Sequence, residues 1–370
     1  MVGAMRWAAG SLYSGGKDGQ LKVWTVGSWA APAKTIDFSG ILVRAIDVAG
    51  GNAVVGMRDG TIYQIDLTSG SKQAIMESHS DGEVWGLEVV NNDFVLTTAD
   101  DNRVKVWDVK QKKCVSRGTV SSAQRKVKRG GASTLSTFPD SQCSRAVACN
   151  PTNGHVAVGH NDGTLTVRAS YQQLDQVIHE NTNAKEWIEF MRYSPDGSKL
   201  AVGSHDNSIY YYSATDYKLL GKFSKHNSFI TSFDWSADGT IMRSVCGAYE
   251  LLFSSTETFQ QDTHGASSTV GTQWATNHVK FGWLVEGIFP PGTPGCHING
   301  VDFSHNGQLI ATGDDYGLVN VFRNPCRNGH KPISLRGHSE HVVRVAFSKD
   351  DSMLFSVGGY DQTLMQWRKQ

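Results

Sequence analysis

The chain has 370 residues, and its 35 Lys and Arg residues balance its 35 Asp and Glu residues, so the formal net charge is zero. A general nucleic-acid-binding protein needs a positive field, so nucleic acid is not an expected partner. No run reaches the roughly 18 apolar residues of a membrane-spanning helix, so we expect no membrane contact either. The 39 glycines disfavour a helix-rich fold, because each interior glycine costs about 1 kcal/mol of helix stability.

Cysteine usage and the first residues suggest a compartment. The six cysteines are scattered and form no C-x-x-C pair, which is typical of a reducing environment rather than of a disulfide framework. The first ten residues lack the basic-then-apolar layout of a signal peptide. We therefore expect a cytoplasmic protein rich in β-structure.

One sequence unit recurs along the chain. Its clearest copy, residues 189–213, predicts three strands separated by turns at Pro195-Asp196-Gly197 and at Asp206-Asn207, because Val, Ile and Tyr runs alternate with turn residues. In chain order, copies occur at residues 12–24, 54–65, 96–107, 156–168, 189–213, 242–254, 310–322 and 354–367.

The spacing of the copies predicts a β-propeller. Five of the seven gaps between their ends fall at the ~40–45 residues of a four-stranded propeller blade. The other two gaps contain extra sequence, at about 109–139 and 255–295. Eight copies predict an all-β propeller of about eight four-stranded antiparallel blades. We expect one domain over residues 1–370, because no Pro/Ser-rich linker divides the series.

Some copies carry a known signature. The copy ending at Trp107 has His79, Thr98 and Asp101, and the final copy has Gly337-His338, Ser356, Asp361 and Trp367. These residues resemble the WD40 repeat, whose His, Ser/Thr, Asp and Trp form a hydrogen-bonded set inside a blade. That resemblance implies a structural role for them and no catalytic one.

Longer stretches resemble a narrower family. The segments HSDGEVWGL (79–87) and HNSFITSFDWS (226–236), the blocks WAT (274–276) and GWLVEGIFP (282–290), and the final 31-residue repeat are similar to the C-terminal β-propeller of the echinoderm microtubule-associated protein-like proteins. The resemblance implies a non-catalytic scaffold that binds tubulin or microtubules, located on the cytoskeleton, including cilium or spindle. Family members usually carry a preceding propeller, which this chain does not resemble.

Enzyme and metal motifs are missing from the sequence. The segment Ser14-Gly15-Gly16-Lys17 fails the phosphate-loop pattern, and neither a G-x-S-x-G elbow nor an H-E-x-x-H pair occurs. Cys296, His297 and His305 lack zinc-ligand spacing. We therefore expect no catalytic residues, no cofactor and no metal.

The insert at 109–139 is strongly basic. It has eight Lys and Arg residues and no Asp or Glu. One interpretation is a loop that contacts an acidic partner such as tubulin, through Arg125, Lys126, Lys128 and Arg129. The alternative is a solvated flexible loop without a fixed partner, which repulsion between like charges favours.

Propellers generally bind partners on the narrow face, near the entries to the innermost strands. Counting back from each expected innermost strand places eight candidate partner-binding residues at that rim: Arg44, Trp85, Arg145, Trp187, Phe229, His297, Asn299 and His341. Turn residues Lys17, Arg58, Asn161, His205 and Tyr360 should lie beside them. Trp85 or Trp187 could instead pack between blades, and a one-residue slip in register would turn any of these side chains away.

The chain ends suggest an incomplete last blade. The first expected innermost strand starts at Val2, and only three residues follow Trp367, so the outer strand of blade eight is not evident. We expect a three-stranded last blade whose open edge invites strand addition. The family resemblance implies that residues 281–289 form an outer strand of blade seven.

A competing function is a general WD40 adaptor, such as a substrate-recognition subunit of a ubiquitin ligase. The W-D-x-R docking pattern of such adaptors is missing, because the Trp107-Asp108 pair is followed by Val109-Lys110. A propeller enzyme would need carboxylates or histidines converging on the central channel.

Overall fold

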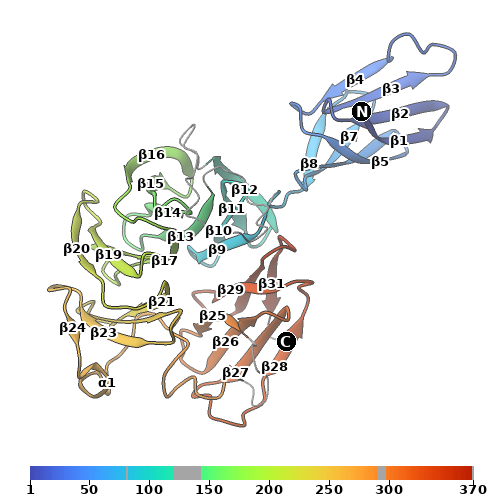
Figure 1. The fold of residues 1–370 in the computed structure, drawn as a ribbon. Coiled ribbons are helices and arrows are strands. Elements are labelled where there is room, and N and C mark those ends of the chain that lie inside the picture. The colour runs from blue at the N-terminus through green and yellow to red at the C-terminus, as the bar shows by residue number, and fades with distance from the viewer. Residues whose placement is uncertain (81, 120–142, 290–296, 369–370) are drawn as a thin grey trace. The chain divides into compact units, whose positions relative to one another are not determined.

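The computed structural model describes residues 1–80, 82–119, 143–289 and 297–368 (Figure 1). Over these ranges the chain forms 31 strands and one short helix, α1 (Gly265–Ser268). No helix among the described residues is long and apolar enough to cross a membrane. The chain divides into two compact units, Met1–Asp81 and Gly82–Gln370, and each is described by itself.

The first unit contains two four-stranded antiparallel sheets. Leu21, Val43 and Ile65 are fully buried in the core that the two sheets share. The Asp18-Gly19 turn between the second and third strands needs glycine, because Gly19 has a φ of +68° and its position lies against the backbone of Gly40. The strands are β1 (Val2–Ala8), β2 (Ser11–Gly16), β3 (Gln20–Thr25), β4 (Lys34–Asp37), β5 (Val43–Ala49), β6 (Asn52–Met57), β7 (Ile62–Asp66) and β8 (Lys72–Met76).

The second unit contains six antiparallel sheets, each formed by strands that follow one another along the chain. The first three are β9 (Val84–Val89), β10 (Phe94–Ala99), β11 (Arg103–Asp108) and β12 (Lys113–Thr119); β13 (Ser144–Cys149), β14 (Val156–His160), β15 (Leu165–Ser170) and β16 (Gln173–Asn181); and β17 (Ile188–Tyr193), β18 (Lys199–Ser204), β19 (Ser208–Ser213) and β20 (Leu219–Phe223). The other three are β21 (Ile230–Trp235), β22 (Ile241–Cys246), β23 (Leu251–Ser255) and β24 (Gln261–Asp262); β25 (Ile298–Phe303), β26 (Leu309–Asp314), β27 (Leu318–Arg323) and β28 (Ile333–Arg336); and β29 (Val342–Phe347), β30 (Met353–Gly358) and β31 (Leu364–Arg368).

The six sheets of the second unit close into a ring with their first strands innermost (Figure 1). The last sheet packs directly on the first, because Val84 and Leu87 share a buried core with Phe355 and Val357. Hydrogen bonds join the same two sheets, one from the Gln362 Nε2 amide to the Gly82 carbonyl at 2.9 Å. Within the unit Gly82–Gln370, the last sheet therefore contacts the first.

The predicted fold class is confirmed. The described residues form an all-β WD40 propeller fold with eight antiparallel sheets, seven of four strands and a last one of three. A single ring over residues 1–370 stays a prediction. In the structure, β29 contacts β9 directly, and the first two sheets belong to the separate unit Met1–Asp81. Strand addition at the edge of the last sheet also stays a prediction.

Two expectations about the inserts need correction. The basic insert is shorter than 109–139, because β12 takes Lys113–Thr119 as an ordinary outer strand. The prediction of an outer strand at 281–289 is wrong: these residues form turns, and the outer strands of the neighbouring sheets are β24 and β28. Val285 and Ile288 are nevertheless buried against Ile298 and Phe322. An apolar run alone does not distinguish a strand from a buried loop.

Residues 274–280, called here the wedge segment, lie between β21 and β25. At one end Ala275 donates its backbone N–H to the Trp235 carbonyl at 2.9 Å. At the other end the Lys280 ammonium donates to the Ile298 carbonyl. The wedge segment therefore links two neighbouring innermost strands through hydrogen bonds.

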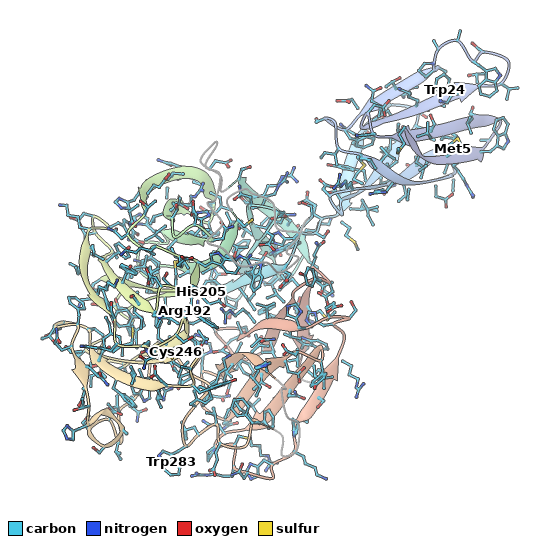
Figure 2. All side chains as sticks on the ribbon, viewed as in Figure 1. Met5, Trp24, Arg192, His205, Cys246 and Trp283 are labelled. Atoms are coloured by element: carbon cyan, nitrogen blue, oxygen red, sulfur yellow. The ribbon has the colours of Figure 1, made fainter. Side chains whose placement is uncertain are left out.

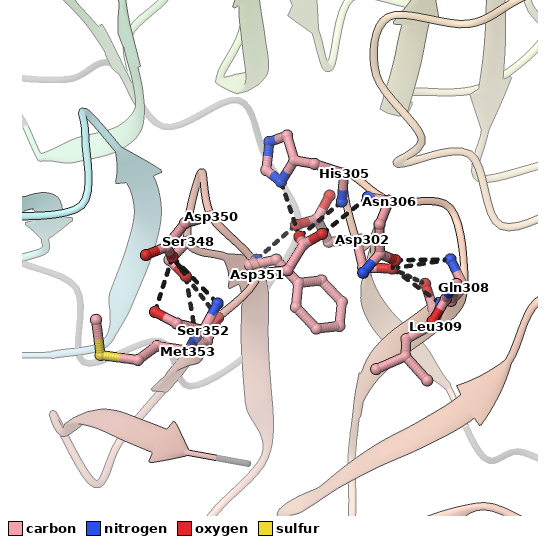
Figure 3. Close-up of polar contacts among 12 residues, drawn as sticks. Asp302, His305, Asn306, Gln308, Leu309, Ser348, Asp350, Asp351, Ser352 and Met353 are labelled. Atoms are coloured by element: carbon pink, nitrogen blue, oxygen red, sulfur yellow. Dashed lines mark hydrogen bonds and ion pairs between the residues drawn. The ribbon is translucent and has the colours of Figure 1, made fainter.

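The last two sheets are joined at their β-turns (Figure 3). The Asp351 carboxylate accepts the backbone N–H groups of His305 at 2.7 Å and Asn306 at 2.8 Å, and it lies 3.1 Å from His305 Nδ1. Close by, Asp302 accepts the backbone N–H of Phe347 at 2.7 Å. Each of these acidic side chains satisfies donors of the adjoining sheet.

Candidate functional site

Each innermost strand of the ring carries a β-bulge at its second residue. The register of each pairing with the next strand shifts there, so one extra residue stands opposite the partner strand. Bulges of this kind re-aim a side chain and occur often next to functional sites. The bulge residues are Trp85, Arg145, Glu189, Thr231, Asn299 and Val343.

A cavity of about 630 Å³ opens at this end of the ring, and we call it the channel mouth. Five bulge residues line it, all except Arg145. Three residues that directly precede an innermost strand also line it, namely Phe229, His297 and His341. The remaining lining residues are Cys246, Gly247, Tyr249, Lys280, Phe281, Asp315, Glu340 and Arg344. The channel mouth thus combines aromatic, acidic and basic side chains.

Glu189 is paired with basic side chains in the channel mouth. Its carboxylate lies 3.0 Å from Arg344 Nη2 and 3.4 Å from His205 Nε2. Burial opposes the charge of Glu189, but His205, Arg344 and Arg145 outweigh it and lower the pKa of this carboxyl. Glu189 is therefore ionised and paired at neutral pH.

Two other cationic side chains differ in their surroundings. His341 Nε2 lies 3.1 Å from the buried carboxylate of Glu83, which raises the pKa of His341. Lys280 forms no ion pair among the described residues, and burial lowers its pKa to about 8. A partly buried ammonium without a carboxylate partner favours an acidic group supplied from outside the chain.

Aromatic rings form an exposed group at one side of the channel mouth. Phe229 stacks on His205 at 4.6 Å between ring centres, and His205 lies 5.2 Å from Trp187. Tyr249 is 69% exposed and contacts Phe281 edge to face. His205 and Cys246 lie toward the middle of the ring in Figure 2. Exposed aromatic side chains of this kind are frequent anchors of protein interfaces.

Arg145 lies behind the cavity rather than in it. Its guanidinium is stacked between Trp85 at 4.0 Å and Trp187 at 4.5 Å, and only 2% of the residue is exposed. The same guanidinium lies 3.3 Å from the carboxylate of Asp100. Arg145 therefore positions the two tryptophans and does not present its charge to a partner.

The structure brings together most of the rim residues that the sequence predicted. Trp85, Phe229, His297, Asn299 and His341 line the channel mouth, and Trp187 packs against Arg145 behind it. Arg44 is the exposed bulge residue of β5 in the unit Met1–Asp81. The basic residues Arg125, Lys126, Lys128 and Arg129 lie outside the described residues. Partner binding by the rim residues, and by these four basic residues, stays a prediction.

Sequence reasoning missed four important residues of the channel mouth: Glu189, Cys246, Tyr249 and Lys280. Glu189 could have been found, because it stands one position after the start of an innermost strand, as Trp85 and Asn299 do. Lys280 could not, since the wedge segment has no counterpart in the other repeats.

Comparisons with known proteins agree with this architecture. The family model described as the echinoderm microtubule-associated protein second beta-propeller matches residues 84–369. The chain is 55% identical over 370 residues to the ciliary WD repeat-containing protein ctxp80 of Euplotoides octocarinatus, covering 100% of this chain and 51% of that protein. It is 34% identical over 363 residues to the 77 kDa echinoderm microtubule-associated protein of Lytechinus variegatus, covering 96% and 51%.

A third relative extends the match to mammals. The chain is 33% identical over 369 residues to echinoderm microtubule-associated protein-like 1 of Mus musculus, covering 97% of this chain and 42% of that protein. The chain thus spans about half the length, or less, of these curated relatives. The resemblance noted in the sequence is confirmed: the chain belongs to the echinoderm microtubule-associated protein family of WD40 repeat proteins.

Proposed function

We propose that the chain is a non-catalytic scaffold of the microtubule cytoskeleton and that it binds tubulin through the channel mouth. Two of the relatives reported above are named as microtubule-associated proteins and the third as a ciliary WD repeat protein. These names support a place on cytoskeletal microtubules, including those of a cilium.

The observation that carries the proposal is the composition of the channel mouth. Phe229 and Tyr249 present exposed rings beside a cavity large enough for several side chains of a partner. Lys280 supplies an ammonium that donates to the Ile298 carbonyl and has no carboxylate within ion-pair distance among the described residues, although Glu189 and Asp315 attract it from farther away. Aromatic anchors around a cation suit an acidic protein segment, and tubulin surfaces and tails are acidic.

The acidic residues of the channel mouth fit binding better than catalysis. Glu189 is paired with Arg344 and His205, and Asp315 accepts a hydrogen bond from Asn299 Nδ2 at 2.8 Å. A carboxylate that acts as a general acid or base needs a pKa near the working pH, whereas the pKa of Glu189 is lowered. None of the three relatives carries the name of an enzyme.

Sedimentation with polymerised microtubules, and binding to soluble tubulin measured separately, would test this proposal. Replacing Phe229 and Tyr249 together by Ala should raise the Kd by about tenfold or more, because interface anchors contribute roughly 2 kcal/mol or more. Ile333→Ala removes an exposed apolar side chain from the outer strand β28 and serves as the control. Equal affinity of the double variant and the control would rule out the channel mouth as the tubulin contact.

A second variant tests the basic insert. Arg125, Lys126, Lys128 and Arg129 changed to Ser should reduce binding, and salt should do the same, if the insert provides the contact. If this variant loses tubulin binding and the Phe229/Tyr249 double variant keeps it, the tubulin contact lies on the insert and not at the channel mouth. Failure of the unaltered chain to bind either form of tubulin would favour the adaptor alternative.

A further inference from the structure

His226, Cys246 and Glu250 converge beside the channel mouth in the sheet β21–β24. One ligand-type atom from each side chain lies within 4.8 Å of the other two. Cys246 Sγ is 3.2 Å from Glu250 Oε2, and His226 Nδ1 is 3.7 Å from the same oxygen. Cys246 also lines the cavity and is labelled in Figure 2.

The last sheet contains the His–Ser–Asp set of the WD40 signature at the corresponding place. There His338 Nε2 lies 2.7 Å from Ser356 Oγ, and its Nδ1 lies 2.8 Å from Asp361. The register Val342↔Gly358 matches Ile230↔Cys246, so Cys246 occupies the place of Gly358.

A side chain at this place points at the imidazole. A Cβ built on Gly358 would lie 2.5 Å from His338 Nδ1 and 2.1 Å from the Asp361 carboxylate. In the sheet β21–β24 a thiol fills this place, and the nearby carboxylate comes from Glu250. In place of the His338–Asp361 pair of the last sheet, the sheet β21–β24 therefore brings three side chains together: His226, Cys246 and Glu250.

The imidazole of His226 has an unused nitrogen. Its side chain is 0% exposed, Nε2 lies 2.7 Å from Ser244 Oγ, and the ring packs edge to face on Phe223. Nδ1 is buried and has no hydrogen-bond partner among the described residues. Buried polar atoms nearly always have a partner, so this nitrogen calls for one.

We propose that His226 Nδ1, Cys246 Sγ and Glu250 Oε2 bind a zinc ion. Imidazole, thiolate and carboxylate are the three protein ligands of zinc, and bond lengths of about 2.0–2.3 Å place neighbouring ligand atoms roughly 3.3–3.8 Å apart in a tetrahedron. The separations of Glu250 Oε2 from Cys246 Sγ, 3.2 Å, and from His226 Nδ1, 3.7 Å, fall close to this range. The contact of His226 Nε2 with Ser244 orients the ring as outer-shell partners of metal ligands do.

The remaining ligand chemistry is also in place. Cys246 binds as the thiolate, so zinc uptake releases its proton to solvent. Glu250 Oε2 also accepts the Asn227 backbone N–H at 3.0 Å and has a second lone pair for the metal, while Oε1 accepts a hydrogen bond from the Asn227 side chain. Three protein ligands leave the fourth tetrahedral position for water or for a group of a bound partner.

Isothermal titration with Zn²⁺ under reducing conditions, on the full chain after treatment with a chelator, tests the proposal. We expect one Zn²⁺ per chain, and Co²⁺ in its place should give a thiolate-to-metal charge-transfer band. Cys246→Ser and Glu250→Gln should each weaken Zn²⁺ binding by at least about 100-fold, since loss of outer-shell partners alone costs ~10–100-fold. Cys149→Ser, which removes a partly buried thiol from another sheet, should bind Zn²⁺ as the unaltered chain does.

Thermal unfolding without metal checks that each variant is folded. If Cys246→Ser does not fold, Cys246→Gly copies the residue of the last sheet, and Glu250→Gln alters a turn residue that is partly exposed. Zinc binding that is absent from the unaltered chain, or that Cys246→Ser and Glu250→Gln leave unchanged, overturns the proposal.

Discussion

Asp302 illustrates how a single buried carboxyl affects the stability of the ring. Burial raises the pKa of Asp302 to about 6, although Phe347 donates a hydrogen bond to it. His278 Nδ1 lies 3.7 Å away, but burial lowers the pKa of that imidazole well below its usual value, so it stays neutral near pH 7. The charge of Asp302 is therefore poorly compensated.

This arrangement predicts a pH-dependent effect of Asp302→Asn. The folded-state pKa of about 6 exceeds the ordinary aspartate pKa of 3.8, so the stabilising contribution of Asp302 is full below about pH 4 and is lost as pH rises through 6. Asparagine keeps an oxygen acceptor for Phe347 and carries no charge. Relative to the unaltered chain, the variant should gain about 2 kcal/mol in the free energy of unfolding between pH 4.5 and pH 7.5.

Urea unfolding of both proteins at several pH values measures this difference. Asp315→Asn, a change at an exposed aspartate, controls for the altered net charge. A difference between Asp302→Asn and the unaltered chain that stays constant across pH would contradict the assigned role of Asp302.

Some residues of the site could be predicted from the sequence, and others could not. Trp85 and Asn299 could be predicted, because a strand start is visible in the sequence and the bulge follows it directly. Arg145 occupies the same position but is enclosed by two tryptophans, which no pattern along the chain reveals. His226 and Cys246 are 20 residues apart, and only the pairing of β21 with β22 brings them together.

At the scale of elements, Asp234 organises the wedge segment. Asp234 is 0% exposed and accepts four hydrogen bonds. They come from Thr276 Oγ1 at 2.9 Å, the His278 N–H at 2.6 Å, the Val279 N–H at 3.1 Å and Arg243 Nε at 3.0 Å. One carboxylate thus holds a segment without regular secondary structure against β21.

Asp234→Ala should lower the free energy of unfolding by about 3 kcal/mol or more, because it leaves the partly buried Arg243 without its carboxylate partner and three other donors without their acceptor. The wedge segment should then exchange its amide hydrogens faster than the neighbouring strand β25. Asp238→Ala, in a turn of the same sheet, removes an exposed carboxylate that accepts hydrogen bonds from Ser236 and Thr240. This change should lower the free energy of unfolding by no more than about 1 kcal/mol. Similar losses in the two variants would show that Asp234 does not anchor the segment.

The strands that recur in every copy of the repeat could be predicted from the sequence, and the variable outer strands could not. The three inner strands of each sheet follow turn signals such as Asp196-Gly197 and were placed correctly by pattern. The fourth strands vary in length and composition, from the nine residues of β16 to the two residues of β24. A two-residue strand has no periodicity to detect, and the family resemblance placed an outer strand at 281–289, where the structure has turns.

At the scale of the whole molecule, a repeat count predicts how many sheets form but not which sheets are neighbours. The count of eight is confirmed, and the order of the strands within each sheet follows the chain. Ring closure depends instead on Val84 and Leu87 meeting Phe355 and Val357, which are about 270 residues away in sequence. The family model for a second propeller begins at residue 84, close to the division between the two units.

These contacts predict that residues 82–370 fold without residues 1–81. The core between the first and last sheets of the ring, and the bond from Gln362 to Gly82, lie wholly inside this fragment. The fragment should unfold cooperatively, with a Tm within about 5 °C of the corresponding transition of the full chain.

A single eight-bladed ring leads to the opposite expectation. Removing two of its blades would expose the apolar faces of β9 and β29, and the fragment would then aggregate or lose its cooperative transition. Calorimetry of the fragment beside the full chain separates the two cases. A fragment that stays monomeric and melts cooperatively places the complete propeller in residues 82–370, because only a ring that closes β29 onto β9 keeps Val84 and Phe355 away from water.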